Sequence, residues 1–545
     1  MAVRLTAWVG TCALAVWVCA VAARVPGHAA PQSRPTGEDR VAGGSLRMLS
    51  EAPKSLDPAD GDSVYESLPL NQIFNGLVVL DPSLNVLPSL ASSWTISRDG
   101  RIYTLRLRSG VTFHDGSTLT AEDVVFTFRR LLTPVRGQRN IVCSYLQNIE
   151  GAGAFSAGRT GELPGVAAMD SLTVRIRLQR PYYSFLQVLA MDGLKIVPKA
   201  FLERRGDAVF DRSPVGTGPF RLAEWDEDHL SLAANQEFFG HKPSLDRVDI
   251  YFFRPGETDS GTGRFDRGEI DVLEVPGEDL DRLSHNPGVR IHRYQELSLS
   301  FLGISCTAGP LRDVRIRQAI AQALDRETLV KDAPRHRRAA SSILPPGLHG
   351  YSPRPKTLPF DRDGTRILLE KAGHPGGRGL PAVDLFCNAS KTASVRTARR
   401  IQSDLREVGV PVRIQAVPWH ELSRRIDEQT APLFLLSWVA DLADPDSFLR
   451  TLFESEGSSN FFRFHDDVTE GLLAQGEREL NPVVRAEIYR RSETRILEIA
   501  PLVPLYHPIS HLAVRAGIHG LEPGPLGISN VNLGKVWLTR EGPGS

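Results

Sequence analysis

The chain has 545 residues, which is enough for two or more domains. Its 41% hydrophobic and 23% charged residues are ordinary for a soluble globular protein. Lys plus Arg and Asp plus Glu each total 64, so the formal net charge is zero. A chain without excess charge has no overall field that attracts nucleic acid or an anionic membrane, so we expect neither as a partner.

The N-terminus has the pattern of a secretory signal peptide. Arg4 precedes an apolar run from Ala7 to Ala23, and small residues follow it. We therefore predict a signal peptide over residues 1–30 and an exported protein of the periplasm or cell envelope. The apolar run is at the lower length limit for a membrane span, so an uncleaved anchor is the alternative.

The stretch from Leu84 to Arg130 predicts a β-hairpin followed by a helix. Alternating apolar and polar residues flank Asp99-Gly100, a dipeptide typical of hairpin turns. Thr120 and Asp123 have the spacing of a capping box, so we expect a helix to begin directly after Thr120.

Three cysteines lie beyond the N-terminal segment, and their spacing matches neither a metal site nor a CxxC redox pair. Cys306 and Cys387 fall in strand-like runs, where buried unreactive thiols are expected. Export also permits a Cys306–Cys387 disulfide, which we keep as the alternative.

The stretch from Asp384 to Leu452 predicts a β-α-β-α-β unit. Along this stretch the spacing of the apolar residues switches between the pattern of a strand and the pattern of a helix. The helix predicted within "SVRTARRIQSDLREVG" stops at Gly409. This order implies parallel strands with helices packed on them.

Polar and aromatic residues follow the ends of these strands. Asn388, Trp419 and the segment Ser437–Asp441 come directly after the three predicted strands. In parallel sheets ligands bind at the carboxyl ends of strands, so these positions predict a binding cleft.

Motifs for catalysis are absent from the sequence. It contains no P-loop, no GxSxG, no HExxH and no EF-hand loop. We therefore expect no enzyme activity, no catalytic residues, no metal site and no cofactor.

Several stretches together resemble the family 5 extracytoplasmic solute-binding proteins, the peptide-, oligopeptide- and nickel-binding components of ABC importers. The resemblance covers roughly residues 43–538. It is carried in register by "SLDPADGDSVYES", "IFNGLVVLDPSLNVLPSLASSWTISRDGRIYTLRLRSGVTFHDGSTLTAEDVVFTF", "PVGTGPF", "LRDVRIRQAIAQALDRETLV", "SDLREVGVPVRIQAVPWHELSRRI" and "SWVADLADPDSFL".

The resemblance implies an α/β, two-lobed periplasmic-binding-protein fold of type II, the large peptide-binding type with an extra subdomain. Lobe I would span 43–295, with the subdomain at about 65–194. Lobe II would span 296–501, and 502–545 would return to lobe I. Such a protein, expected as a monomer, closes over its ligand and delivers it to an ABC transporter permease.

The resemblance also implies roles for individual residues. Asp441 occupies the position at which peptide-binding relatives hold the α-amino group of the ligand, and Trp419 the position of a pocket-lining tryptophan. The backbone of Ser437, Trp438 and Val439 would pair with an extended peptide, as in strand addition.

Two further aspartates follow Asp441 in "DLADPDSF". Asp444 and Asp446 flank a proline, and we expect both to cap the helix that starts near Ser447.

One position departs from the pattern of dipeptide-binding relatives. They place an arginine where this chain has Asn388, to hold the carboxylate of the ligand. Lys391 is nearby, but an ammonium is a point charge and lacks the bidentate fork of arginine. We therefore expect an oligopeptide, or a ligand with an amine and no fixed carboxylate. An opine, a sugar, a metal chelate or a sensing role are the alternatives.

Overall fold

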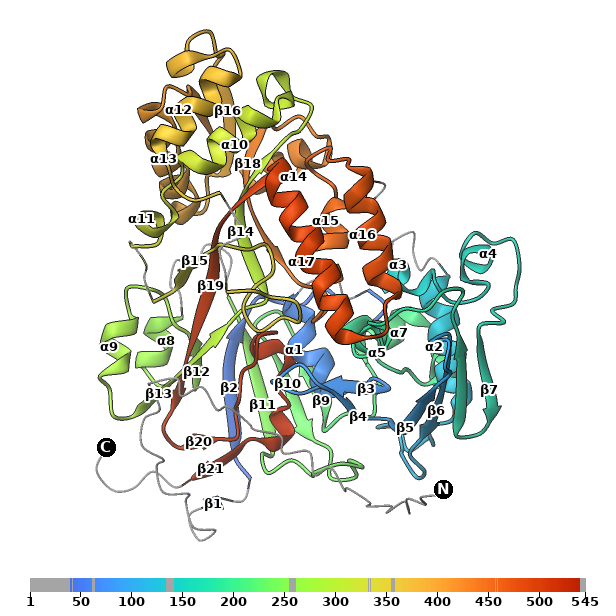
Figure 1. The fold of residues 1–545 in the computed structure, drawn as a ribbon. Coiled ribbons are helices and arrows are strands. Elements are labelled where there is room, and N and C mark those ends of the chain that lie inside the picture. Colours follow the sequence, from blue (N-terminus) through green and yellow to red (C-terminus); the bar gives the residue numbers. More distant parts are fainter. Residues whose placement is uncertain are drawn as a thin grey trace, which may run out of the picture. The chain divides into compact units, whose positions relative to one another are not determined.

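The computed structural model describes residues 40–41, 43–60, 64–133, 142–253, 261–331, 333, 335–353, 358–455, 457 and 459–539. The predicted signal peptide, residues 1–30, lies outside this part of the chain. Among the described residues, no helix combines the length and the apolar character that crossing a bilayer requires. The mixed α/β class expected from the sequence is confirmed (Figure 1).

One four-stranded sheet is built from segments far apart in the chain, in the order β2-β11-β10-β9. Its first strand runs parallel to β11, and the other pairs are antiparallel. The strands are β2 (Ser45–Ser50), β9 (Phe220–Trp225), β10 (His229–Ala234) and β11 (Arg247–Phe252). Their buried apolar side chains share a core with α1 (Val64–Ile73) and with residues 512–536.

A second four-stranded sheet, β5-β6-β8-β7, is antiparallel throughout. The predicted hairpin is confirmed, because β5 and β6 pair across the turn at Asp99-Gly100. The predicted capping box is also confirmed: the Thr120 N–H donates to the Asp123 carboxylate at 2.8 Å, and α2 begins at Ala121. The elements of this region are β5 (Ala91–Ile96), β6 (Ile102–Leu107), α2 (Ala121–Leu132), α3 (Val142–Leu146), α4 (Ala152–Ser156), β7 (Val166–Asp170), β8 (Thr173–Arg177) and α5 (Phe185–Val188).

The predicted β-α-β-α-β unit is confirmed. Strand β16 pairs in parallel with both β17 and β18, so the three carboxyl ends point the same way. Helix α13 buries Ala398, Ile401 and Leu405 in the core that it shares with β16. The elements are β16 (Val383–Asn388), α13 (Thr392–Glu407), β17 (Val412–Val417), α14 (Trp419–Asp427) and β18 (Leu433–Val439).

A long strand, β19 (Leu502–Arg515), joins this unit to the rest of its sheet (Figure 1). Its first half pairs with β14 and β15, and its second half with β12 and β13. The chain also passes from β13 directly into β14. Both strands pair with β19, so this second connection runs beside it. The partners are β12 (Val272–Glu274), β13 (Val289–Gln295), β14 (Ser298–Ile304) and β15 (Arg337–Ala339).

The remaining elements are helices and short strands, and these strands form two small sheets of their own. The helices are α6 (Lys199–Arg205), α7 (Asp207–Arg212), α8 (Thr262–Asp266), α9 (Leu280–Ser284), α10 (Val314–Ala323), α11 (Arg326–Val330), α12 (Arg362–Lys371), α15 (Leu449–Phe453), α16 (Asp467–Arg478) and α17 (Pro482–Ile499). The short strands are β1 (Arg40–Val41), β3 (Val78–Leu80), β4 (Val86–Pro88), β20 (Ile518–His519) and β21 (Trp537–Thr539). Short 3-10 turns include η2 (Asp192–Leu194) and η5 (Pro445–Ser447).

The described chain from Arg40 onward is one compact unit with several hydrophobic cores. One core draws on residues between 59 and 196, and two others draw on residues between 297 and 505. The proposed lobe boundaries, 43–295, 296–501 and 502–545, stay a prediction.

The described cysteines carry free thiols, so the alternative of a Cys306–Cys387 disulfide is wrong. Burial raises the pKa of both thiols, because it disfavours the thiolate. A raised thiol pKa disfavours nucleophilic reactivity at Cys306 and Cys387.

Candidate binding site

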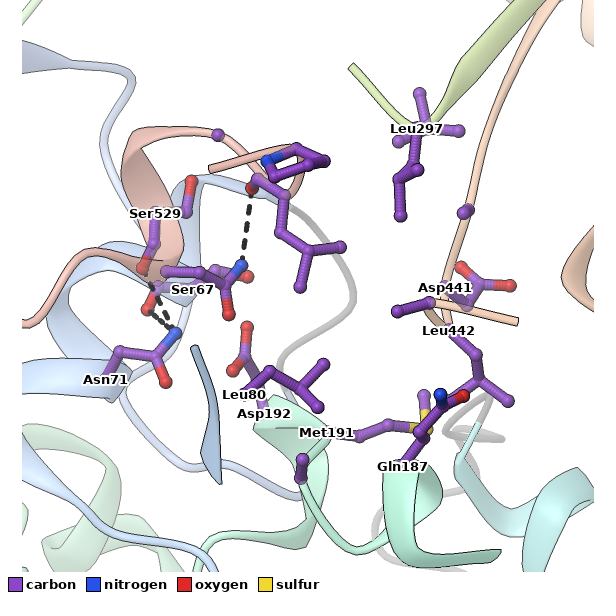
Figure 2. Close-up of a pocket in the computed structure, with 18 of the residues that line it drawn as sticks. Ser67, Asn71, Leu80, Gln187, Met191, Asp192, Leu297, Asp441, Leu442 and Ser529 are labelled. Atoms are coloured by element: carbon purple, nitrogen blue, oxygen red, sulfur yellow. Dashed lines mark hydrogen bonds between the residues drawn. The ribbon is translucent and has the colours of Figure 1, made fainter. Parts of the chain in front are cut away.

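A cavity of about 460 Å³ lies beside the loop that follows β18. Its wall is assembled from α1, the α5–η2 segment, the ends of β12 and β13, residues 439–443 and residues 525–530. Figure 2 shows Ser67, Asn71 and Ser529 on one side of the cavity and Asp441 and Leu442 on the other. Ligand cavities typically measure about 300–1,000 Å³, so this one has room for a small ligand.

The loop that carries Asp441 is held by backbone hydrogen bonds. The Ala440 N–H donates to the Leu297 carbonyl at 2.9 Å. The N–H groups of Asp441 and Leu442 donate to Ser447 Oγ at 2.8 and 3.3 Å. Leu442 is buried in the core formed by residues 59–196. The loop is therefore held both by these hydrogen bonds and by the packing of Leu442.

Asp441 is a half-buried residue of the cavity wall. Burial raises its pKa to about 6, and the hydroxyl of Tyr145, 3.5 Å from Oδ2, partly opposes this shift. Within the described residues Asp441 forms no ion pair. A positively charged ligand group would supply the missing counter-charge.

We expect Asp441→Asn to stabilise the empty protein at about pH 8, where the buried carboxylate is ionised. The pKa of Asp441 is raised on folding, so its contribution to the free energy of unfolding is lost as the pH rises through about 6. The advantage of the variant should therefore disappear toward pH ~4. Melting curves across this range check the prediction, and a constant difference at every pH would contradict it.

Of the other predicted site residues, Val439 lines the cavity and four do not. The Trp438 indole N–H donates to the Ser447 carbonyl at 2.7 Å, and the Ser437 hydroxyl bonds the Ser300 hydroxyl at 2.6 Å. Asn388 is buried and accepts a hydrogen bond from the Ser390 N–H at 2.9 Å. Trp419 is 53% exposed. The ligand contacts of these four residues stay a prediction.

The edge of β18 near the cavity can accept a further strand. Pairing of β18 with β14 extends to Val439, but its recorded pairing with β16 stops at Phe434. The edge from Ser437 to Val439 that faces away from β14 therefore has no strand partner in the described chain. An extended peptide could bind this edge by strand addition.

The cavity wall has a second acidic part, formed by Glu274 and Glu296, which the sequence pattern did not predict. Glu274 lines the cavity. Burial and, to a smaller extent, the charge of Glu296 raise the pKa of Glu274, and the Tyr294 hydroxyl, 3.5 Å from its carboxylate, opposes the shift. Glu296 accepts hydrogen bonds from the hydroxyls of Ser298, at 3.0 Å, and Ser510. Both acids stand at strand ends, the signal that identified Asp441.

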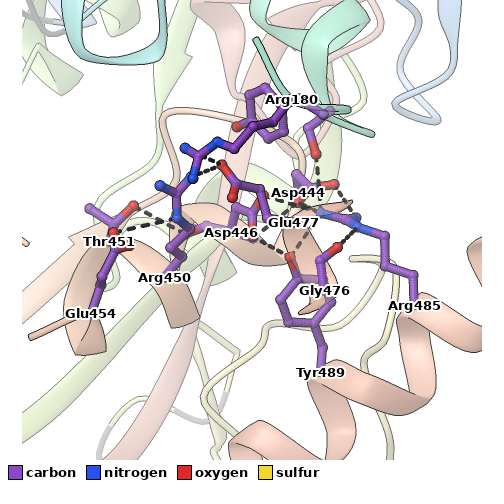
Figure 3. A network of polar contacts seen from close by, with 12 residues as sticks. Arg180, Asp444, Asp446, Arg450, Thr451, Glu454, Gly476, Glu477, Arg485 and Tyr489 are labelled. Atoms are coloured by element: carbon purple, nitrogen blue, oxygen red, sulfur yellow. Dashed lines mark hydrogen bonds and ion pairs between the residues drawn. The ribbon is translucent and has the colours of Figure 1, made fainter. Parts of the chain in front are cut away.

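The prediction that both Asp444 and Asp446 are helix caps is only half right. Asp444 caps η5, accepting from the Asp446 N–H at 3.0 Å. Asp446 is no cap: its fully buried carboxylate faces Arg485 at 3.2 Å and the Tyr489 hydroxyl (Figure 3). Asp444 also pairs with Arg485, through two bonds of 2.7 Å. The two aspartates therefore belong to a buried ion-pair network.

One group of side chains in the described chain has the composition of a metal site. Ligand atoms of Glu224, Asp226 and His229 lie within 4.8 Å of one another at the β9–β10 turn. Glu224 and Asp226 are exposed, and none of the three residues lines the cavity. The group has no connection with the candidate binding site.

Comparison with known proteins finds matches along most of the chain. The sequence profile described as "Bacterial extracellular solute-binding proteins, family 5 Middle" matches residues 85–460. Heme-binding protein A of Haemophilus influenzae is 28% identical, over 88% of this chain and 89% of its own. Di/tripeptide-binding protein 4 of Pseudomonas aeruginosa is 30% identical, over 84% and 88%.

A solved structure matches the fold over a similar length. It is the ABC transporter-associated periplasmic binding protein DppA from Helicobacter pylori in complex with peptide STSA. The match has a TM-score of 0.77 and 26% identity, and covers 92% of this chain and 99% of the other. The predicted two-lobed fold of periplasmic peptide-binding proteins is thereby confirmed.

Proposed function

Because this chain belongs to the bacterial extracellular solute-binding proteins of family 5, we propose that it captures an oligopeptide and delivers it to the permease of an ABC importer. Proteins of this family bind solutes for transport and are not enzymes. The cavity beside Asp441 is the proposed binding site.

The observation that carries the proposal is the carboxylate of Asp441, a half-buried residue of the cavity wall that has no ion-pair partner among the described residues. An α-ammonium group is a suitable partner, since charge-assisted hydrogen bonds are strongest where water is excluded. The free edge of β18 at Ser437–Val439 lies next to Asp441, so the peptide backbone could continue along it.

The chemistry around Asn388 favours a ligand longer than a dipeptide. Its side-chain oxygen is engaged with the Ser390 N–H, and a neutral amide cannot replace a bidentate arginine. A dipeptide whose carboxylate must be held at that position would lack the arginine that binds this carboxylate. Relatives named for di- and tripeptides support the peptide class.

We place the protein in the periplasm. We expect residues 1–30 to direct its export as a signal peptide, which is then cleaved. The location of the homologous binding proteins supports this proposal, and the cleavage itself rests on the N-terminal sequence pattern. An ABC permease is the expected partner.

Thermal-shift screening of alanine peptides of two to five residues tests the proposal. A ligand that binds only the folded state adds about 2.7 kcal/mol to the free energy of unfolding at 100 times its Kd. We expect the longer peptides to raise the melting temperature more than dialanine does. If no peptide raises it while another solute does, the peptide assignment is wrong.

The second candidate is a non-peptide solute in the same cavity. The relative named a heme-binding protein favours this alternative, because it is similar over most of both chains. Heme, an opine and a sugar belong in the same screen, so that one experiment separates the two candidates.

A further inference from the structure

The wall of the cavity carries an excess of negative charge. Among the described residues that line it, the charged ones are four acids and one base, namely Asp192, Glu274, Glu296, Asp441 and Lys195. Lys195 Nζ already lies 3.5 Å from Asp192 Oδ1, and the lysine side chain is only 5% exposed. In the described part of the chain, the other three acids form no ion pair. The described wall therefore offers no free cation for a ligand carboxylate.

The three unpaired acids form two separate groups. Glu274 ends β12 and Glu296 lies between β13 and β14, and the charge of each acts on Tyr294 between them. Asp441 follows β18, and its pKa is set by burial and by Tyr145 rather than by another carboxylate. The cavity thus has one anionic pole at Asp441 and another at Glu274 and Glu296.

The cavity wall also offers a neutral acceptor. Gln187 Oε1 is shielded from solvent and has no hydrogen-bond partner among the described residues. Figure 2 shows Gln187 near Leu442, on the side of the cavity that carries Asp441. Acceptors without donors favour a ligand rich in N–H groups.

We propose that the ligand carries two positive groups, an α-ammonium beside Asp441 and a lysine or arginine side chain beside Glu274 and Glu296. This inference rests on the proposed function and specifies the class of peptide. Two neighbouring carboxylates repel each other, and a cation between them removes the repulsion and adds charge-assisted hydrogen bonds. A glutamate side chain at the same place would increase the repulsion.

Calorimetric titration with Ala-Ala-Ala peptides carrying Lys, Gln or Glu at position 2 or 3 tests the inference. At one of these positions we expect Lys to bind at least about tenfold more tightly than Gln, which corresponds to about 1.4 kcal/mol, and Glu more weakly than Gln. Equal affinities for Lys, Gln and Glu at both positions would overturn the inference while leaving peptide binding intact.

Two variants connect this preference to the second pole. Glu274→Gln should abolish most of the preference for Lys over Gln. Glu278→Gln changes an exposed acid four residues along that does not line the cavity, and should preserve the preference. If both variants keep it, the second cation binds elsewhere and the assignment to Glu274 is wrong.

A diamine separates failure of the inference from failure of the proposed function. If 1,5-diaminopentane binds while no peptide does, the dicationic preference stands and the proposed peptide function is wrong. If lysine peptides bind and the diamine does not, both the peptide backbone and the second charge are required, as proposed.

Discussion

Arg485→Met is expected to lower the free energy of unfolding by about 3–5 kcal/mol at neutral pH. Arg485 is fully buried on α17, with two bonds of 2.7 Å to Asp444 and one of 3.2 Å to Asp446. Burial alone would lower the pKa of its guanidinium, but the two carboxylates outweigh burial and raise it. Methionine keeps much of the volume and removes the ion-pair partner of both carboxylates, so that Asp446 keeps only the longer-range charge of Arg450.

The free energy of unfolding that Arg485→Met removes should grow with pH. Even with Arg485 present, burial raises the pKa of Asp446 to about 6, so its contribution to stability is lost as the pH rises through that value. Without the arginine, the folded-state pKa of Asp446 must rise further, because the attraction of Arg485 is gone. Urea unfolding should therefore show a smaller loss at about pH 5 than at about pH 8.

Arg490→Met is the matched control on the same helix. Arg490 pairs with Glu487 at 2.6 Å in an exposed i,i+3 arrangement, and such surface pairs contribute about 0–1 kcal/mol. An Arg485→Met variant as stable as this control would show that the buried network contributes nothing.

Asp441→Asn is expected to weaken binding of a peptide with a free N-terminus by at least about thirtyfold. Breaking a buried hydrogen-bonded charge pair costs about 2–5 kcal/mol, and about 1.4 kcal/mol is tenfold in Kd. Asparagine has nearly the same shape, so the loss reports the charge. Calorimetric titration measures it, with Asp467→Asn, which changes a 95% exposed side chain, as the control.

The pH dependence and an acetylated peptide provide independent checks on this variant. The pKa of Asp441 is about 6 in the empty cavity, so wild-type affinity should fall as the pH drops through that value. The variant should lack this dependence, and N-acetylation should cost the wild type about as much as the substitution does. If acetylation leaves the affinity unchanged, Asp441 does not hold the amine.

Local sequence pattern was sufficient for the elements around β18. Alternation and helical spacing predicted the β-α-β-α-β unit, and the rule for strand carboxyl ends placed Asp441 at a cleft. The capping box at Thr120 is also local, since its two residues are three positions apart. Such features depend on neighbours in the sequence, which a single chain displays directly.

The partners of the site residues depend on distant parts of the chain. Tyr145 meets Asp441 across 296 positions, and Arg485 meets Asp444 across 41. Local spacing therefore made Asp446 look like a cap, whereas tertiary packing buries it beside an arginine. The pole at Glu274 and Glu296 was missed for the same reason, because β19 brings the ends of β12 and β13 together.

A crystal structure of the protein with a bound tri- or tetrapeptide tests the central claim most directly. We expect the α-amino nitrogen to lie about 2.7–2.9 Å from a carboxylate oxygen of Asp441, within the cavity beside β18. A peptide bound with its amine away from Asp441, or bound outside this cavity, would contradict the account.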